Sequence, residues 1–124
     1  MNMTATPTKT DFIEIRTSDL LLKQLDWAVA THEMSFTLTI GDDGKLYMPP
    51  CKAWAPSQDW GQGGPLLAIH NITWDGQAAT ICKQRDGRYQ KWTEYGQTQL
   101  VAGLRAILAW RNGPTMLVPA ELAH

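Results

Sequence analysis

The central segment of the chain, residues 54–65, reads WAPSQDWGQGGP. It contains two of the six tryptophans, Trp54 and Trp60, together with three glycines, two prolines and one carboxylate. Proline removes backbone donors and glycine adds backbone entropy, so this composition disfavours both helix and strand. We therefore predict an ordered loop, which either folds back on the core or presents its indole rings to a ligand or partner.

Length and charge limit the class of protein. A chain of 124 residues fits one domain that buries roughly two-thirds of its unfolded surface. The formal net charge of −1 and the pI near 6.3 disfavour a protein that works mainly by neutralising nucleic-acid phosphates. No apolar run approaches the roughly 18 residues of a membrane span, and the polar N-terminus is neither a signal peptide nor an anchor. We expect a cytoplasmic protein.

The two cysteines, Cys51 and Cys82, form no C-x-x-C pair. The simplest expectation is two reduced thiols, with Cys82 buried.

The N-terminal half predicts a strand over residues 12–16 and a helix over residues 19–31, capped by Thr17 or Ser18. One face of that helix carries the apolar stripe expected to reach the core: Leu21, Leu22, Leu25, Ala28 and Val29. Trp27 lies nearly opposite the stripe. A helix with apolar side chains on two opposite sides needs a second segment to cover the side that faces away from the core. We therefore expect the central segment to cover Trp27.

Alternation and Asp-Gly turns predict the remaining strands. Residues 36–40 and 45–48 form one predicted hairpin, while residues 72–74, 79–83 and 88–93 form a three-strand meander. Thr98 caps a helix over residues 99–111, and Gly113-Pro114 ends it before a strand at residues 116–118. The predicted fold class is α+β, with two helices packed on one antiparallel sheet of about four to six short strands. Residues 1–11 and 120–124 are predicted tails around a single domain, residues 12–119.

Motifs for cofactor or metal chemistry are weak. His32, His70 and His124 are scattered, so we expect no metal site, and nothing indicates a cofactor. The glycines at 61, 63 and 64 match neither a phosphate loop nor a dinucleotide fingerprint, because Pro65 follows them directly. A tight turn is the better interpretation.

The predicted hairpin over residues 79–93 is mildly basic, with Tyr89 and Trp92 interleaved among its cations, a pattern that in a basic protein would indicate single-strand binding. The cations are Lys83, Arg85, Arg88 and Lys91. Because the whole chain is near neutral, we favour a solvated hairpin.

Three stretches resemble the signature blocks of the NinX-like family of phage and prophage proteins: LDWAVA at residues 25–30, PSQDWGQGGP at 56–65 and YGQTQL at 95–100. The resemblance spans most of residues 12–118. It implies a small cytoplasmic protein encoded by a phage or prophage, with no established biochemical activity.

The polar and aromatic residues that a core does not explain fall in these three stretches. We predict a non-enzymatic site for a small anionic, nucleotide-like ligand, with stacking rings, carboxylate acceptors and backbone donors. Its residues are Asp26, Trp27, Trp54, Ser57, Asp59, Trp60, Gly63, Gly64, Tyr95 and Thr98. The alternatives are an adaptor or inhibitor of a host protein, anchored by Trp54 and Trp60, and a nucleotide-acting enzyme with Asp26 or Asp59 as general base. A purely structural role for the central segment also stays open.

Overall fold

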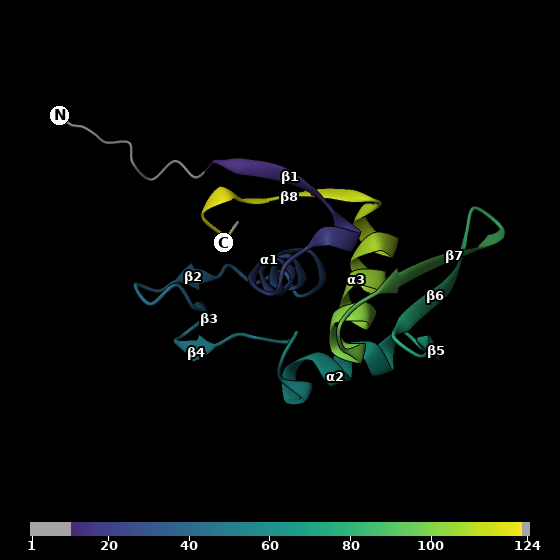
Figure 1. The fold of residues 1–124 in the computed structure, drawn as a ribbon, viewed down its shortest axis with the longest axis horizontal. Helices are drawn as coiled ribbons and strands as arrows, with labels where there is room; N and C mark the ends of the chain where they lie inside the picture. Colours follow the sequence, from purple (N-terminus) through teal and green to yellow (C-terminus); the bar gives the residue numbers. More distant parts are fainter. Residues whose placement is uncertain (1–10, 123–124) are drawn as a thin grey trace.

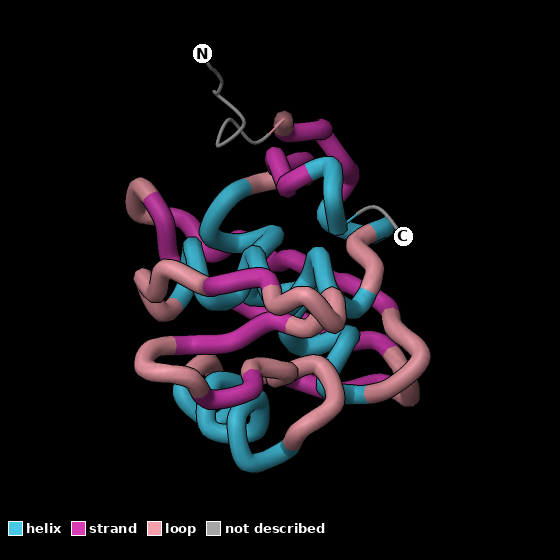
Figure 2. The backbone as a smooth tube through the Cα atoms, turned by 90° about the vertical axis from the view of Figure 1, so that its left-hand side faces the viewer, coloured by secondary structure: helices cyan, strands magenta, loops and turns pink. Residues whose placement is uncertain are grey.

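A computed structural model describes residues 11–122 and shows an α+β arrangement (Figure 1). The three α-helices are α1 (Leu22–Ala28), α2 (Trp60–Ile69) and α3 (Gln99–Asn112). The strands form three small antiparallel sheets rather than the single sheet that we predicted. The predicted class is thus confirmed, but the predicted layering is wrong, because each short sheet packs separately around the helices (Figures 1 and 2). None of the described helices is long and apolar enough to cross a membrane.

Helix α3 lies at the centre of the fold. Nine of its 14 residues are buried, and α1, α2 and strands of two sheets contact it. Thr98 caps the helix as predicted, with its Oγ1 accepting a hydrogen bond from the Val101 amide at 3.2 Å. Nearly every face of α3 is therefore covered, and the other elements are placed relative to it.

The ends of the described chain pair as two strands. β1 (Phe12–Arg16) runs antiparallel to β8 (Thr115–Pro119), with Phe12 opposite Pro119. Both strands were predicted. The predicted C-terminal tail begins too early, because residues 120–122 form a 3-10 turn and Leu122 is buried in the core. The predicted N-terminal tail lies almost wholly outside the described residues.

The first helical region differs from the single predicted helix. A 3-10 turn, Thr17–Asp19, precedes α1, and a π-helical turn, Val29–Glu33, follows it. The cap is not Thr17 or Ser18: the Gln24 side chain accepts from the Leu21 amide at 2.9 Å. Because the helix begins later than predicted, Leu20 is buried, whereas Leu21 and Leu22 are 50% and 38% exposed.

The second sheet is small and consists of β2 (Thr39–Ile40), β3 (Leu46–Met48) and β4 (Lys52–Ala53). The predicted hairpin is present, but its first strand is shorter than residues 36–40, and β4 was not predicted.

The third sheet is the predicted meander: β5 (Thr73–Asp75), β6 (Ala78–Arg85) and β7 (Arg88–Tyr95). Cys82 lies on β6, where it is exposed rather than buried as expected, because it points away from α3. Cys51 is exposed too, and both thiols are free, as predicted.

The central segment is only half a loop, because α2 begins at Trp60 and contains all three glycines and Pro65. The Asp59 side chain caps the helix by accepting from the Gly61 amide at 2.8 Å. Pro65 removes one intrahelical hydrogen bond, but Leu66 and Leu67 are buried against the core. Tertiary burial thus outweighs the poor helix propensity from which we predicted a loop.

Gly63 explains why a glycine-rich sequence suits this helix. A Cβ added at Gly63 would lie 2.3 Å from the Pro56 carbonyl oxygen and 2.9 Å from Leu100 Cδ2. Gly103 of α3 is similar, since its Cβ would lie 2.4 Å from Leu67 Cδ2. These glycines permit α2, the residues before it and α3 to approach closely.

A buried carboxylate fastens the start of the central segment to α1. Asp26 is 2% exposed and accepts from the Ser57 amide at 2.7 Å and from Ser57 Oγ at 2.9 Å. Trp54, itself buried, donates from Nε1 to the Asp26 carbonyl at 2.8 Å. Burial raises the pKa of the Asp26 carboxyl from 3.8 to about 6, although the Ser57 hydrogen bonds oppose that rise.

We predict that Gly63→Ala destabilises the protein by about 2 kcal/mol or more, because the methyl group meets a backbone carbonyl that cannot rotate away. Gly61→Ala is the matched control on the same helix, where a Cβ meets only the Asp59 side chain at 3.1 Å and alanine favours the helix. Urea unfolding of both variants measures the difference. Equal stability of the two variants would contradict the packing role of Gly63.

We predict that the Asp26 carboxyl makes stability fall as pH rises between about 4 and 6. The folded state binds this proton more tightly than the unfolded state, so ionisation costs up to about 3 kcal/mol of unfolding free energy above that range. Asp26→Asn keeps an acceptor for the Ser57 amide and offers a donor to its hydroxyl, without a charge. Urea unfolding from pH 4 to 8 should show this fall in the wild type relative to Asp26→Asn. Parallel profiles would refute the account.

Candidate functional site

The predicted site residues lie around several hollows rather than one. Ser57, Trp60 and Thr98 line a common hollow, whereas Asp26 and Trp54 line a second. Trp27 and Tyr95 line two further hollows. The structure therefore brings together one subset of the predicted residues, centred on Trp60.

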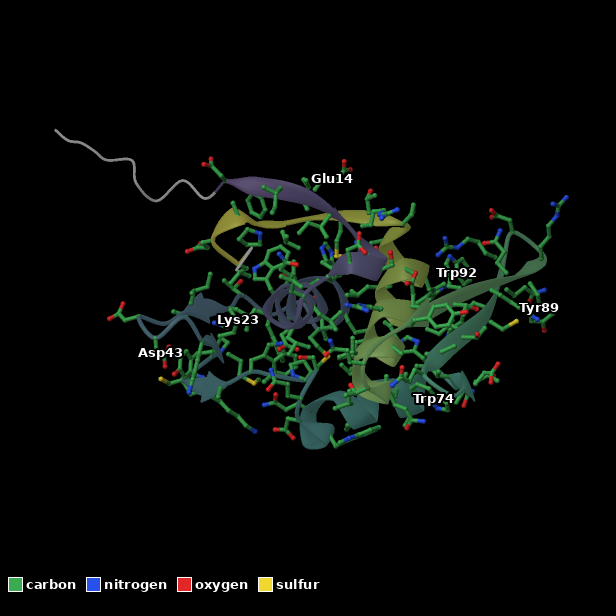
Figure 3. All side chains as sticks on the ribbon, viewed as in Figure 1. Glu14, Lys23, Asp43, Trp74, Tyr89 and Trp92 are labelled. Atoms are coloured by element: carbon green, nitrogen blue, oxygen red, sulfur yellow. The ribbon has the colours of Figure 1, made fainter. Side chains whose placement is uncertain are left out.

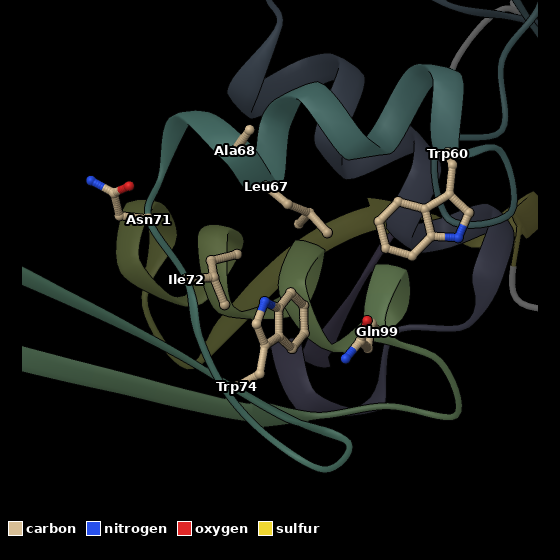
Figure 4. A pocket seen from close by; sticks show the side chains of 7 residues that line it. All are labelled: Trp60, Leu67, Ala68, Asn71, Ile72, Trp74 and Gln99. Carbon is tan, nitrogen blue, oxygen red and sulfur yellow. The ribbon is translucent and has the colours of Figure 1, made fainter.

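Two hollows meet at Trp60, and together we call them the Trp60 groove. The first, of about 390 Å³, lies between α2, β5 and the start of α3 (Figure 4). Its lining residues are Trp60, Leu67, Ala68, Asn71, Ile72, Trp74 and Gln99. The second, of about 290 Å³, lies on the other side of Trp60. It is lined by Leu22, Ser57, Gln58, Trp60, Gln97, Thr98, Leu100 and Val101.

The Trp60 indole is held in place although it is 56% exposed. Trp60 is the first residue of α2, directly after the Asp59 cap. Gly64, one turn later, lies under the ring: a Cβ there would be 3.3 Å from Trp60 Cε3. Figure 4 shows the indoles of Trp60 and Trp74 extending toward the hollow from α2 and β5, with Leu67 between them. The Trp60 and Trp74 rings thus lie on two sides of an apolar surface formed by Leu67.

Polar groups border this aromatic part of the groove. Asn71 and Gln99 each contribute a side-chain amide that can donate and accept hydrogen bonds. Thr98 Oγ1 accepts from the Val101 amide, while the amides of Gln99 and Leu100 precede the first intrahelical bond of α3. The start of α3 thus supplies backbone donors and the positive end of a helix dipole. No charged side chain is among the residues that line either hollow of the groove.

Asp26 and Trp54 face a different hollow, of about 350 Å³, near Lys23 and Lys45. Both Asp26 oxygens already accept hydrogen bonds from Ser57, and the Trp54 N–H is donated to a backbone carbonyl. These two residues hold the fold together.

Trp27 is not covered by the central segment, so that prediction is corrected. Its neighbours are Phe12 of β1 and the His32 ring, each with a centroid distance of 6.1 Å. The residue of α1 that the central segment covers is Asp26, and the next residue, Trp27, is about 100° further round the helix and faces Phe12 of β1.

Tyr95 lines a hollow of about 370 Å³ with Glu94 and Arg105, and its ring is 67% exposed. Arg105 donates to the carbonyls of Tyr95 and Leu20, at 2.8 and 2.7 Å. Burial raises the pKa of the Glu94 carboxyl and lowers that of the Arg105 guanidinium, and each charge partly offsets the shift of the other. The arrangement ties β7 to the start of α1.

Trp74, Asn71 and Gln99 were missed as candidate site residues. Gln99 adjoins the predicted cap Thr98 and so carried a signal by position. Trp74 was assigned only to a strand, and nothing in the sequence relates its place to that of Trp60. Within residues 11–122, no three His, Cys, Asp or Glu side chains gather to hold a metal ion.

Comparison with known proteins identifies the chain at the level of a family. No curated protein matches it. A family model described as bacteriophage P22, NinX matches residues 16–111, which include α1, α2, β5, β6 and β7 and most of α3. The matched range contains every residue of the Trp60 groove. The resemblance of the three sequence blocks is thereby confirmed, and the chain belongs to the NinX family of bacteriophage P22 proteins.

Proposed function

We propose that this NinX-family chain is a non-enzymatic binding module that takes a small planar ligand of the nucleotide type in the Trp60 groove. One observation carries the proposal. The Trp60 indole, more than half exposed, borders a hollow whose opposite side is a second indole, Trp74. An indole fixed at the edge of a concave surface is suited to stacking on a planar group.

The energetics favour a flat aromatic ligand. Stacking on an indole contributes about 0.5–1.5 kcal/mol beyond the burial of apolar area. The Gly64 backbone and the Asp59 cap fix Trp60 in advance, so little side-chain entropy is lost on binding. Leu67 and Ile72 supply the apolar floor that a ring would cover.

The polar part of a nucleotide has partners in the same groove. The Asn71 and Gln99 amides suit the mixed donor and acceptor edge of a base. The Gln99 and Leu100 amides at the start of α3 suit an attached phosphate, worth about 0.3–1 kcal/mol as a dipole interaction. Because no lysine or arginine lines the groove, we expect the planar ring to contribute more to affinity than the phosphate.

The geometry favours binding over catalysis. Asp26, one candidate general base, is buried with both oxygens engaged by Ser57. Asp59, the other candidate, is engaged as the cap of α2. Neither carboxylate lines the Trp60 groove, so a base positioned there would have to come from elsewhere.

An adaptor that binds a host protein is the second candidate function. The observation that favours it is the exposure of apolar side chains on the elements that form the groove: Leu22, which lines it, is 38% exposed, and Ile69 at the end of α2 is 68% exposed. Trp60 would then be the anchor in a partner's pocket. Trp54, the other anchor that we considered, is buried and hydrogen-bonded.

We predict that millimolar AMP or another nucleoside monophosphate raises the melting temperature of the protein and changes its tryptophan fluorescence. A ligand that binds only the folded state stabilises it by mass action, by about 1.4 kcal/mol at ten times its dissociation constant. Trp60→Ala should abolish the thermal shift and leave the fold intact, because the ring is mostly exposed. Tyr95→Ala removes a similarly exposed ring outside the groove and should retain the shift.

Two results would overturn the proposal. One is the absence of any thermal shift across a panel of nucleosides, nucleotides and dinucleotides. The other is an equal loss of the shift in Trp60→Ala and Tyr95→Ala. If the panel is negative and a host protein is retained at stoichiometric level by the wild type but not by Trp60→Ala, the adaptor function replaces the ligand site.

A further inference from the structure

The outer half of the β6–β7 hairpin is a second surface, which the Trp60 groove does not use. The tip of the hairpin projects away from α3, at the right of Figure 1. Residues 83–91 hold four cations, Lys83, Arg85, Arg88 and Lys91, against one carboxylate, Asp86. The net charge of the whole chain is near zero, but this segment of the hairpin is strongly basic.

The strand register gathers most of these cations on one face. Arg85 pairs with Arg88, Lys83 with Gln90, and Ile81 with Trp92. Directly paired residues share a face of the sheet, and that face alternates along each strand. The C-terminal turn of α3 adds Trp110 and Arg111 beside it. We call this set the cationic face: Lys83, Arg85, Arg88, Trp92, Trp110 and Arg111.

Aromatic rings hold the cations of this face in place. Lys83 Nζ lies 4.8 Å from the Trp110 ring centroid, and Arg85 Cζ lies 5.4 Å from that of Trp92. Arg85 also donates to the Trp110 carbonyl at 3.2 Å. Cations fixed in this way lose less side-chain entropy when they meet an anion than free surface cations do.

Among the described residues, Arg111 is the one cation of the cationic face that forms a salt bridge with a carboxylate. Glu33 is engaged by Arg111 and by His70 Nε2, the latter at 2.8 Å, so its charge is already shared. Asp86 lies in the turn at the tip, and Glu94 lies two residues beyond Trp92 toward Arg105. Arg85 and Arg88 are exposed and lack a carboxylate partner among the described residues.

Exposed rings accompany the cations. Trp92 and Trp110, on the cationic face, are partly exposed. Tyr89, next to the hairpin turn, is 76% exposed, but it pairs with Gln84 and so lies on the opposite face of the hairpin (Figure 3). An acidic polypeptide needs cations alone, whereas a single-stranded nucleic acid needs both phosphate partners and rings or guanidinium planes on which bases stack. The geometry points to single-stranded nucleic acid, DNA or RNA, as the ligand of the hairpin. This inference is independent of the nucleotide-type ligand proposed for the Trp60 groove.

The test is fluorescence anisotropy of the full chain with labelled oligothymidylate and oligouridylate of about 20 nucleotides, in about 50–200 mM salt. We expect binding to either or both, with affinity falling as salt rises. Arg85→Gln combined with Arg88→Gln should weaken binding at least tenfold. It should also reduce the slope of log affinity against log salt by about 1.4, since two phosphate contacts are lost. Trp92→Leu should weaken binding about fivefold or more without changing that slope, whereas Tyr89→Ser, on the opposite face of the hairpin, should change affinity less than twofold.

Lys23→Gln combined with Lys45→Gln is the matched control, because it removes the same charge from a different surface. This double variant should change the affinity for the oligonucleotides less than twofold, and Trp60→Ala should leave that affinity unchanged. Circular dichroism and melting temperature establish that each variant is folded. The inference is overturned if neither oligonucleotide binds at about 100 µM protein in low salt, or if the control weakens binding as much as the arginine pair. It is also overturned if polyglutamate competes as well as an unlabelled oligonucleotide, since an acidic protein would then be the partner.

Discussion

The burial of α3 on nearly all its faces is the constraint on which the rest of the structure depends. A helix that contacts α1, α2 and two sheets can be approached closely only where side chains are small. Gly103 admits Leu67 and Trp74 on one side, and Gly96 lies against the first turn, where a Cβ would be 2.6 Å from the Ala102 amide. These contacts fix where α2 and β5 lie, and so they fix the separation of the Trp60 and Trp74 rings that form the groove.

The local sequence pattern predicted the elements in which periodicity and turn residues favour the same structure as the tertiary packing. The helix capped by Thr98, the meander and the β1 and β8 strands all follow from periodicity and turn residues. The prediction of a loop for the central segment was wrong for its second half. Gly63 and Pro65 disfavour a helix locally, but the burial of Leu66 and Leu67 against the core stabilises one. Nothing local shows that the glycines serve close packing, since the atoms they accommodate belong to Pro56 and Leu100. The separation into three sheets could not be predicted from the sequence either, because long-range contacts determine which strands pair.

The site residues were predicted from their polar or aromatic character, without knowledge of where the fold places them. The prediction was therefore right for some residues and wrong for others. Ser57, Trp60 and Thr98 are brought to one hollow. Asp26 and Trp54 have the same polar and aromatic character, but they use it inside the protein, where Ser57 and the Asp26 carbonyl satisfy them. A buried hydrogen-bonded carboxylate and a ligand-binding one look alike in sequence. The NinX-family match covers both kinds of residue and does not separate them.

The central claim is that a planar ligand enters the groove between Trp60 and Trp74. It is tested most directly by following the six tryptophan indole N–H signals in a nitrogen–proton NMR spectrum during titration with AMP. The account predicts that the Trp60 and Trp74 signals shift with a common dissociation constant. The Trp54 signal, whose N–H is donated to Asp26, and the Trp27 signal should stay in place. Shifts confined to Trp54 or Trp27, or no shift at any indole, would contradict it.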